Sequence, residues 1–500
     1  MTAPIEEIGT NSEPRPAKPP RGIVLRNTLW LVLAQLVGTP LSLVVNAAMA
    51  RYLGPGDFGY LYLASTYVTF GFLAVEWGQG LALPALVARR RERLGELLGS
   101  AIVFRTVASA LVYAALAVAS RSLGYDSEFQ GILPLAVLGA AIGTYTSACQ
   151  FAVQGLERSD LMAFGSMGQQ VLGASFVLPT LFLGGGLRAV LLATAASSFV
   201  LLVLVARGAR RIGVGALAVR SSTIKELMVE GYPFMFMGLA MTLQPSIDAV
   251  FMSRLASHEA VGWYAAARKL VGVLVFPVAA LTSALYPTLC RLFPTDGDEF
   301  RRTVTSALRA AIILVVPISI CCAVYADVGI RVFSKQTFGP AEDDLKIFAP
   351  FVFLVYFTMV LGTALAAAGK QRPWTVAQCA CVAMSAILDP LLIPYFEKHY
   401  GNGGLGVCAA AVFSEILMLV AALWLLPGGG GGRGLGRTLL VCAAAGAALA
   451  VIARLLFWLT PFVAAPIAVA GYGATLWLLG GIDREQLQTF KQIIRSKTKR

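Results

Sequence analysis

Charged side chains stand inside stretches of the sequence that are otherwise apolar, and the basic ones predict a site for anions. Guanidinium and ammonium groups bind phosphate and carboxylate oxygens, and arginine does so through two parallel hydrogen bonds. The alternative for each is that the long side chain reaches to the surface of a membrane. The basic candidates for an anion-binding cavity are Arg268, Lys269, Arg51, Arg254, Arg105 and Arg309.

The acidic candidates are Glu76, Asp248, Glu415 and Asp389. A carboxyl group removed from water favours its protonated form unless it is paired. Such a group can exchange a proton or Na⁺ when its exposure changes, which predicts coupling to an H⁺ or Na⁺ gradient. The alternative is a structural salt bridge or hydrogen bond between helices, and Asp389, which precedes Pro390, could simply end a helix.

The composition places these charges in a membrane protein. Hydrophobic residues make up 57% of the 500 residues, charged residues only 13%, and the mean hydropathy is +0.73. Soluble globular proteins carry about 25% charged residues. The longest polar stretches, 1–26, 208–226 and 293–302, are too short to bury a core of their own, which argues against a catalytic head domain.

The sequence contains no pattern for a metal, a disulfide framework or ATP. The eight cysteines lie in or at the end of apolar runs and are interpreted as small packing residues. The two histidines, His258 and His399, are far apart in predicted loops. "GTALAAAGKQ" (362–371) lacks both the spacing and the strand-to-helix context of a phosphate-binding loop. We therefore expect no cofactor.

Apolar runs of the length that crosses a bilayer, about 20 residues, predict an all-α protein with about fourteen transmembrane helices. The predicted spans are 27–49, 60–88, 97–120, 131–153, 161–183, 187–206, 229–252, 260–289, 303–326, 345–369, 374–396, 404–426, 436–458 and 461–480.

The loop charges predict the orientation of these spans. With residues 1–26 inside, the inner segments hold 27 Lys and Arg and the outer loops hold 8. Positive loops face the cytoplasm, so both termini are predicted to be cytoplasmic, in the inner membrane. This topology also accounts for the net charge of +13 without a nucleic acid. The end of the chain, with Leu487, Phe490 and Ile494 among basic residues, is typical of an amphipathic helix at a membrane surface.

An internal repeat divides the chain in two. At an offset of 203 positions, Arg51 corresponds to Arg254 and Gly59 to Gly262. The same register aligns Pro84 with Pro287, six spans later. The repeat predicts two parallel six-helix lobes around a central cavity, plus two C-terminal helices, an arrangement typical of alternating-access transporters.

The resulting domain prediction follows the chain in order. It comprises a disordered cytoplasmic N-terminus (1–26), an N-lobe (27–206), a cytoplasmic linker (207–228), a C-lobe (229–426), a Gly-rich linker (427–435), two further spans (436–480) and a basic amphipathic cytoplasmic tail (481–500).

Several stretches in their order and spacing resemble a known family. They are "ARYLGPGDFGYLYLAS" (50–65), "SIDAVFMSRLASHEAVGWYAAARKL" (246–270), "ALYPTLCRL" (284–292) and "ILDPLLIPYFEKHYGNGGLGVCAAAVFSE" (387–415). From residue 27 onward the chain is similar to the polysaccharide-biosynthesis flippases of the multidrug/oligosaccharidyl-lipid/polysaccharide exporter superfamily. Two positions depart from the family pattern: Asp389 stands where Asn is typical, and Glu76 where Asp is typical.

The resemblance implies that a polyprenyl-pyrophosphate-linked oligosaccharide is moved from the inner to the outer leaflet, and that the basic candidates bind its pyrophosphate or glycan. Arg268 and Lys269 are the foremost candidates, because eight residues into the eighth span correspond to about 12 Å of depth. The implied partners are the lipid-linked oligosaccharide, membrane lipid and polysaccharide polymerases or glycosyltransferases of the same pathway. A monomer is expected, because one chain contains both lobes.

Three alternatives are weaker. A multidrug/cation antiporter of the same superfamily usually has twelve spans and an acidic residue in the first, where this chain has only Gln35 and Asn46. A peptidoglycan lipid-precursor flippase usually has charges in that span. A membrane-bound glycosyltransferase or polymerase would need a large outer loop, and the longest one predicted, 327–344, is too short to form a sugar site around Glu342, Asp343 and Asp344. The protein is therefore predicted not to be an enzyme.

Overall fold

The computed structural model describes residues 21–156, 159–212, 216–293, 296–334, 336–426, 434–456 and 458–481. This part of the chain is almost entirely helical and contains no strand. The helices are α1 (Arg21–Glu76), α2 (Gln79–Arg89), η1 (Arg91–Arg93), α3 (Leu94–Ser122), α4 (Ser127–Gln154), α5 (Ser159–Phe182), α6 (Leu187–Arg211), α7 (Ser221–Leu255), α8 (His258–Leu292), α9 (Gly297–Val324), α10 (Ala326–Phe333), η2 (Gln336–Phe338), α11 (Ala341–Ala367), α12 (Gln371–Tyr400), α13 (Gly404–Leu425), α14 (Leu435–Leu455) and α15 (Pro461–Leu478).

The helix α1 contains two membrane crossings joined by a single turn residue. Gly54 has φ 80° and ψ 175°, a conformation that only glycine adopts readily, and the chain is helical on both sides of it. The second half of α1 continues into α2 across Trp77 and Gly78, which also have positive φ. With α1 counted as two crossings, with α2 joined to the second and with the short α10 left out, the described helices provide about fourteen crossings.

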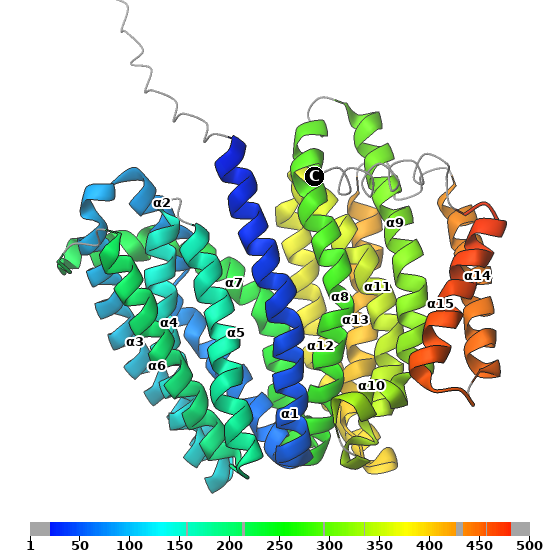
Figure 1. Ribbon diagram of the computed structural model, residues 1–500, viewed down its shortest axis with the longest axis horizontal. Helices are drawn as coiled ribbons and strands as arrows, with labels where there is room; N and C mark the ends of the chain where they lie inside the picture. Colours follow the sequence, from blue (N-terminus) through cyan, green and yellow to red (C-terminus); the bar gives the residue numbers. More distant parts are fainter. Residues whose placement is uncertain are drawn as a thin grey trace, which may run out of the picture.

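The helices form two bundles side by side, with α14 and α15 on the flank of the second (Figure 1). The N-terminal bundle comprises α1 to α6, where α1 packs on α5 and α4 packs on α6. The C-terminal bundle comprises α7 to α13, where α11 packs on α8, α9 and α13, and α12 packs on α7 and α13. This is the predicted architecture of two six-helix lobes with two appended helices.

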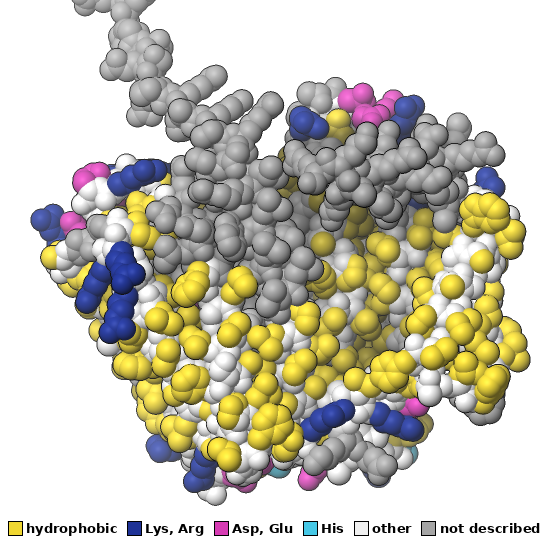
Figure 2. All heavy atoms as spheres, viewed as in Figure 1, with side chains coloured by type: hydrophobic (Ala, Val, Ile, Leu, Met, Phe, Trp, Pro, Cys, Tyr) yellow, Lys and Arg dark blue, Asp and Glu magenta, His cyan; other side chains and the backbone are white. Residues whose placement is uncertain are grey.

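The two ends of this assembly are defined by α1. The end where α1 begins is termed the inner end, and the end that contains Gly54 is termed the outer end. Between them the surface is covered by apolar side chains, while basic and acidic side chains gather at the two ends (Figure 2). Leu183, Trp424 and Phe462 are each at least 75% exposed, which a water-soluble protein would avoid and a bilayer accommodates.

The structure corrects several details of the sequence interpretation. The helix α7 begins at Ser221 instead of at 229, and residues 327–344 contain α10, η2 and the first turn of α11 instead of an open loop. His258 opens α8, and His399 lies in the last turn of α12, so neither histidine is in a loop. The predicted lead-in before residue 21, most of the Gly-rich linker and the tail from 482 lie outside the described residues.

The repeat-related glycines of the two bundles meet at the outer end. A Cβ atom on Gly59 would lie 2.4 Å from the His258 carbonyl oxygen and 3.0 Å from the Gly262 nitrogen. A Cβ atom on Gly262 would lie 1.9 Å from the Pro55 carbonyl oxygen. Because these neighbours are backbone atoms, only glycine permits the approach. The contact closes the outer end between α1 and α8.

Candidate functional site

Two adjoining hollows lie where the N-terminal bundle faces α8, and together they form one central cavity. The larger has a volume of about 470 Å³ and the smaller about 340 Å³, and both are lined by Asn46 and Lys269. The polar side chains that line the larger hollow are Asn46, Tyr62, Ser65, Thr69, Gln169, Thr194, Ser198 and Lys269. The smaller adds Thr39, Ser42, Ser166 and Gln170. Hydroxyl and amide groups of this kind hydrogen-bond to sugar hydroxyls as both donors and acceptors.

Lys269 is the one charged side chain among the residues that line the two hollows. It lies on α8, faces α1 across the gap, and makes no ion pair within the part of the chain that the structure describes. Its ammonium group is therefore available to an anionic ligand. Asn46 donates a hydrogen bond from Nδ2 to the Ser42 carbonyl oxygen at 2.8 Å, which leaves its own side-chain oxygen directed elsewhere.

Arg268, the neighbouring candidate, points away from this cavity into the C-terminal bundle. Its guanidinium carbon lies 5.5 Å from the ring centroid of Phe351 and 5.9 Å from that of Phe348 on α11, a cation–π arrangement. It is also within electrostatic range of Asp248 and Glu415. The two adjacent basic residues thus serve different sides of α8, because consecutive helix residues point about 100° apart.

Two of the four acidic candidates, Asp248 and Glu415, lie within electrostatic range of Arg268, and a third, Asp389, lies beside Asp248. Asp248 on α7 is 4% exposed and Asp389 on α12 is fully buried, and their carboxyl groups lie within electrostatic range of each other. No donor among the described residues reaches either oxygen of Asp389. Glu415 accepts a hydrogen bond from the Thr358 hydroxyl. Two neighbouring buried carboxyl groups favour a shared proton or a bound cation, since both cannot remain charged and unpaired. No group of three or more His, Cys, Asp and Glu in the described ranges is placed as a metal site.

Arg105 is fully buried inside the N-terminal bundle, away from the residues that line the cavity. It donates from Nε to Gln79 Oε1 at 3.0 Å, and from Nη1 to the Ser147 hydroxyl at 2.8 Å and to the Thr144 carbonyl oxygen. Glu76 lies within electrostatic range of it, beside the break between α1 and α2. The three groups that accept hydrogen bonds from Arg105 are therefore all uncharged.

Arg51 and Arg254 make equivalent contacts across the outer end. Arg51 on α1 donates to the carbonyl oxygens of Arg331 and Val332, at 3.1 and 2.5 Å, where α10 ends. Arg254 on α7 donates to the Gly124 carbonyl oxygen at 3.3 Å, just past the end of α3. Each arginine therefore holds a helix end of the opposite bundle, and neither lines the central cavity.

The sixth basic candidate, Arg309, also lies apart from the central cavity. It lines a separate small hollow at the inner end, between α9 and α14. Of the six basic residues that the sequence singled out, only Lys269 is therefore placed against the central cavity.

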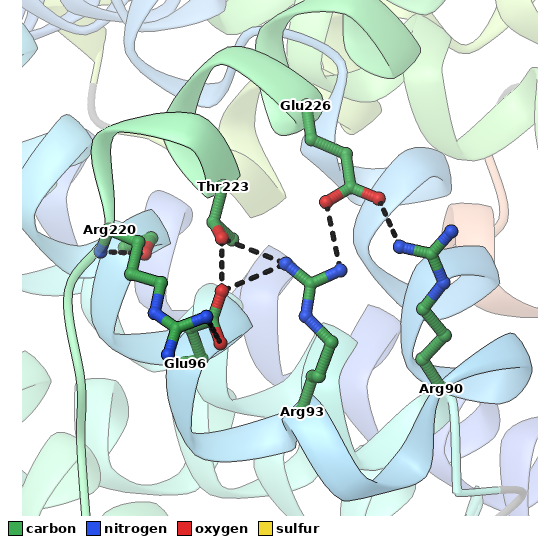
Figure 3. Close-up of polar contacts among 7 residues, drawn as sticks. Arg90, Arg93, Glu96, Arg220, Thr223 and Glu226 are labelled. Carbon is green, nitrogen blue, oxygen red and sulfur yellow. Dashed lines mark hydrogen bonds and ion pairs between the residues drawn. The ribbon is translucent and has the colours of Figure 1, made fainter.

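Sequence reasoning missed an ionic cluster at the inner end, shown in Figure 3. Glu226 of α7 pairs with Arg90 at 3.0 Å and with Arg93 at 3.2 Å. Arg93 also pairs with Glu96 at 2.8 Å, and Glu96 accepts a hydrogen bond from Thr223. The cluster holds the start of α7 against α2 and α3. Its members fall in segments between the predicted spans, where charge predicts solvent exposure, and nothing in the sequence pairs them.

Sequence reasoning also assigned no role to the uncharged polar residues of the cavity. Their signal is present: Asn46, Gln169 and Gln170 are amides inside apolar spans, where an unsatisfied amide is costly. Charge alone was too narrow a criterion for this site.

Two bundles beside a central cavity, with two appended helices, are the architecture of a membrane transporter or flippase. More than half of the chain, residues 24–293, matches the family model Polysacc_synt, described as polysaccharide biosynthesis protein, and the chain belongs to this family. Residues 233–391 also match the family model MatE.

Solved structures share the fold at low sequence identity. The lipid II flippase MurJ in an inward closed conformation is 12% identical, with a TM-score of 0.71 over 93% of this chain and 99% of that chain. A multidrug resistance MATE family transporter in an inward-facing conformation is 17% identical, with a TM-score of 0.60 over 80% and 97%. The MATE transporter VcmN of Vibrio cholerae, in a mutant form, is 15% identical with a TM-score of 0.53 over 80% and 95%. No curated protein matches the chain.

Proposed function

We propose that this protein flips a polyprenyl-pyrophosphate-linked oligosaccharide from the inner to the outer leaflet of the cytoplasmic membrane by alternating access, for the synthesis of a cell-surface polysaccharide. The observation that carries the proposal is the central cavity, in which one ammonium group stands among amides and hydroxyls. Family membership supports the polysaccharide pathway, and the MurJ-like fold supports a lipid-linked substrate.

Each part of the substrate has a matching part of the cavity. The pyrophosphate carries negative charge and many acceptor oxygens, which Lys269 would neutralise with up to three donors. The glycan would hydrogen-bond to Asn46, Gln169, Gln170 and the hydroxyls of α1 and α6. The polyprenyl chain would remain in the bilayer beside the bundles. The same ammonium group repels organic cations, which argues against cationic drugs as the substrate.

Coupling to an ion gradient would use the buried carboxyl groups of the C-terminal bundle. Asp248 and Asp389 join α7 to α12, so a proton or Na⁺ shared between them would hold these helices together. Release of that ion would leave two buried like charges and favour separation. The charges of Glu415 and Arg268 would contribute to the electrostatic potential at this pair of carboxyl groups.

The proposal places both termini in the cytoplasm and treats the single chain as the working unit. Lipid surrounds it, and polymerases or glycosyltransferases of the same pathway are its proposed partners.

The test is a flipping assay with the full chain reconstituted in liposomes. A fluorescent polyprenyl-pyrophosphate oligosaccharide is placed in both leaflets, and the fraction reached by an external reagent is followed with time. We expect the protein to make the protected pool accessible, with empty liposomes as the control. If the pool stays protected while cationic dyes are extruded against an H⁺ or Na⁺ gradient, the protein is an antiporter and the proposal is wrong.

A further inference from the structure

A second polar hollow lies at the inner end, where α9, α14 and the end of α15 meet. Its volume is about 110 Å³, and it is lined by Arg309, Ile313, Gly434, Arg437, Thr438, Val441, Gly480 and Gly481. Among the described residues, the lining brings two arginines together and contains no carboxylate. The central cavity shares none of these residues.

Glycine is required in the wall of this hollow. Gly434, the residue before α14, has φ +98°, and a Cβ atom on it would lie 2.5 Å from Nη2 of Arg309. Gly480 follows α15 with φ +65°, and a Cβ atom there would lie 3.7 Å from Nη2 of Arg437. Glycine at both positions lets the two guanidinium groups reach the same space from different helices.

The hollow opens among apolar side chains that face outward. On α14, Leu440 stands one turn after Arg437 and is 74% exposed. On α15, Trp477 and Leu478 are 65% and 75% exposed, just before Gly480. Figure 2 shows this flank covered by apolar side chains, with basic side chains at its inner end. A ligand with an anionic head and apolar chains would match both parts.

We propose that this hollow binds the phosphate ester of an anionic phospholipid in the leaflet at which α14 begins. Guanidinium groups bind phosphate oxygens in bidentate fashion, and the free N–H groups in the first turn of α14 add donors for an anion. The acyl chains lie along Leu440 and Leu478. The bound lipid joins α14 and α15 to α9, and this role is independent of what the central cavity transports.

Lipid binding by the purified full chain tests the proposal. Native mass spectrometry compares phosphatidylglycerol with phosphatidylcholine for the wild type, for Arg309→Gln with Arg437→Gln, and for Arg437→Gln alone. Arg454→Gln, at the opposite end of α14, is the matched control because it removes the same charge from the same helix. Each arginine near an anionic lipid contributes roughly fivefold, so the double variant should lose about 25-fold in its preference for phosphatidylglycerol.

The outcomes are distinct. The single variant, whose exposed side chain can be removed without disturbing the fold, should lose about fivefold, and the control should keep the full preference. Unchanged preference in both the single and the double variant would overturn the proposal. Displacement of the lipid by millimolar inorganic phosphate would show a site for free phosphate and would overturn the lipid assignment. Because the readout is binding, failure of the flipping assay leaves this result unaffected.

Discussion

The N-terminal bundle, α1 to α6, and the C-terminal bundle, α7 to α13, bury their charges differently. In the N-terminal bundle the buried Arg105 is surrounded by neutral acceptors, and amides and hydroxyls line the cavity. In the C-terminal bundle Asp248 and Glu415 lie within electrostatic range of Arg268, Asp389 lies beside Asp248, and Lys269 is the one charged residue that faces the cavity. The repeat has kept the closing contacts at the outer end, while the interiors differ: neutral polar side chains line the N-terminal bundle, and buried carboxyl groups gather in the C-terminal bundle.

The largest effect is expected from filling the glycine contact that the two bundles share. The change Gly262→Val places a side chain against the Pro55 backbone, so the outer end cannot close. Overpacking of this kind costs about 1–3 kcal/mol, which shifts the equilibrium between conformations by roughly 5- to 150-fold. The rate of flipping should fall by a similar factor.

Gly173→Val on α5 is the matched control, because a Cβ atom there meets nothing within 4 Å. Normal flipping in Gly262→Val would show that the outer contact plays no part in the transport cycle.

The next effect tests the neutral environment of the N-terminal bundle. The change Arg105→Met leaves the side-chain oxygen of Gln79 without its arginine donor and removes the hydrogen bond to Ser147, and an unsatisfied buried group costs about 1–3 kcal/mol. We expect a clearly lower midpoint of thermal unfolding in detergent, with substrate affinity unchanged in the molecules that remain folded. Normal stability combined with weakened substrate binding would instead place Arg105 in the binding site.

A smaller effect on stability is expected in the C-terminal bundle. The change Asp389→Asn removes one of two buried carboxyl groups and supplies an amide donor to Asp248, so the protein should gain about 1 kcal/mol of stability. Flipping should lose its dependence on an imposed H⁺ or Na⁺ gradient. Glu342→Gln in the first turn of α11 removes the same charge elsewhere and should change neither property. Retained gradient dependence in Asp389→Asn would exclude the pair from coupling.

The smallest effects concern the repeat-related arginines. Arg51→Gln and Arg254→Gln each remove exposed hydrogen bonds across the outer end, worth about 1 kcal/mol or less. Each should raise the access of an impermeant thiol reagent to a cysteine introduced at Ser65, by no more than about fivefold. Glu226→Gln, which loosens the inner-end cluster in Figure 3, should lower that access instead. If all three variants changed the access in the same direction, the outer-end contacts and the inner-end cluster would not close opposite ends of the cavity.

Much of the fold could be predicted from the sequence, because apolar length and loop charge are strong one-dimensional signals. The repeat was visible in Arg51 and Arg254, and the structure shows why their spacing matters: each holds a helix end of the other bundle. The break between the spans 27–49 and 60–88 was predicted, but not that a single residue, Gly54, makes the turn inside a continuous run of helix. The early start of α7 was also not predicted, because its first turns are polar and lie against α2 and α3.

The site was predicted less completely. Arg268 and Lys269 were predicted as site residues because of their depth in the eighth span. Depth in the membrane does not determine which side of α8 faces the cavity. Arg105 and Arg309 were proposed on charge alone, and the structure places them in a buried network and in a separate hollow. The grouping of Asp248 with Asp389 depends on α7 lying against α12, a contact between segments some 140 residues apart that no local pattern encodes.

The most direct test of the central claim is the flipping rate of Lys269→Gln, measured against substrate concentration and beside Lys269→Arg and Lys346→Gln. Lys346 is an exposed lysine paired with Asp343 at 2.8 Å. Loss of a charged hydrogen bond to the headgroup should lower substrate affinity by about ten- to a hundredfold in Lys269→Gln, while Lys269→Arg retains transport and Lys346→Gln matches the wild type. Full affinity in Lys269→Gln would show that the ammonium group in the central cavity does not bind the substrate.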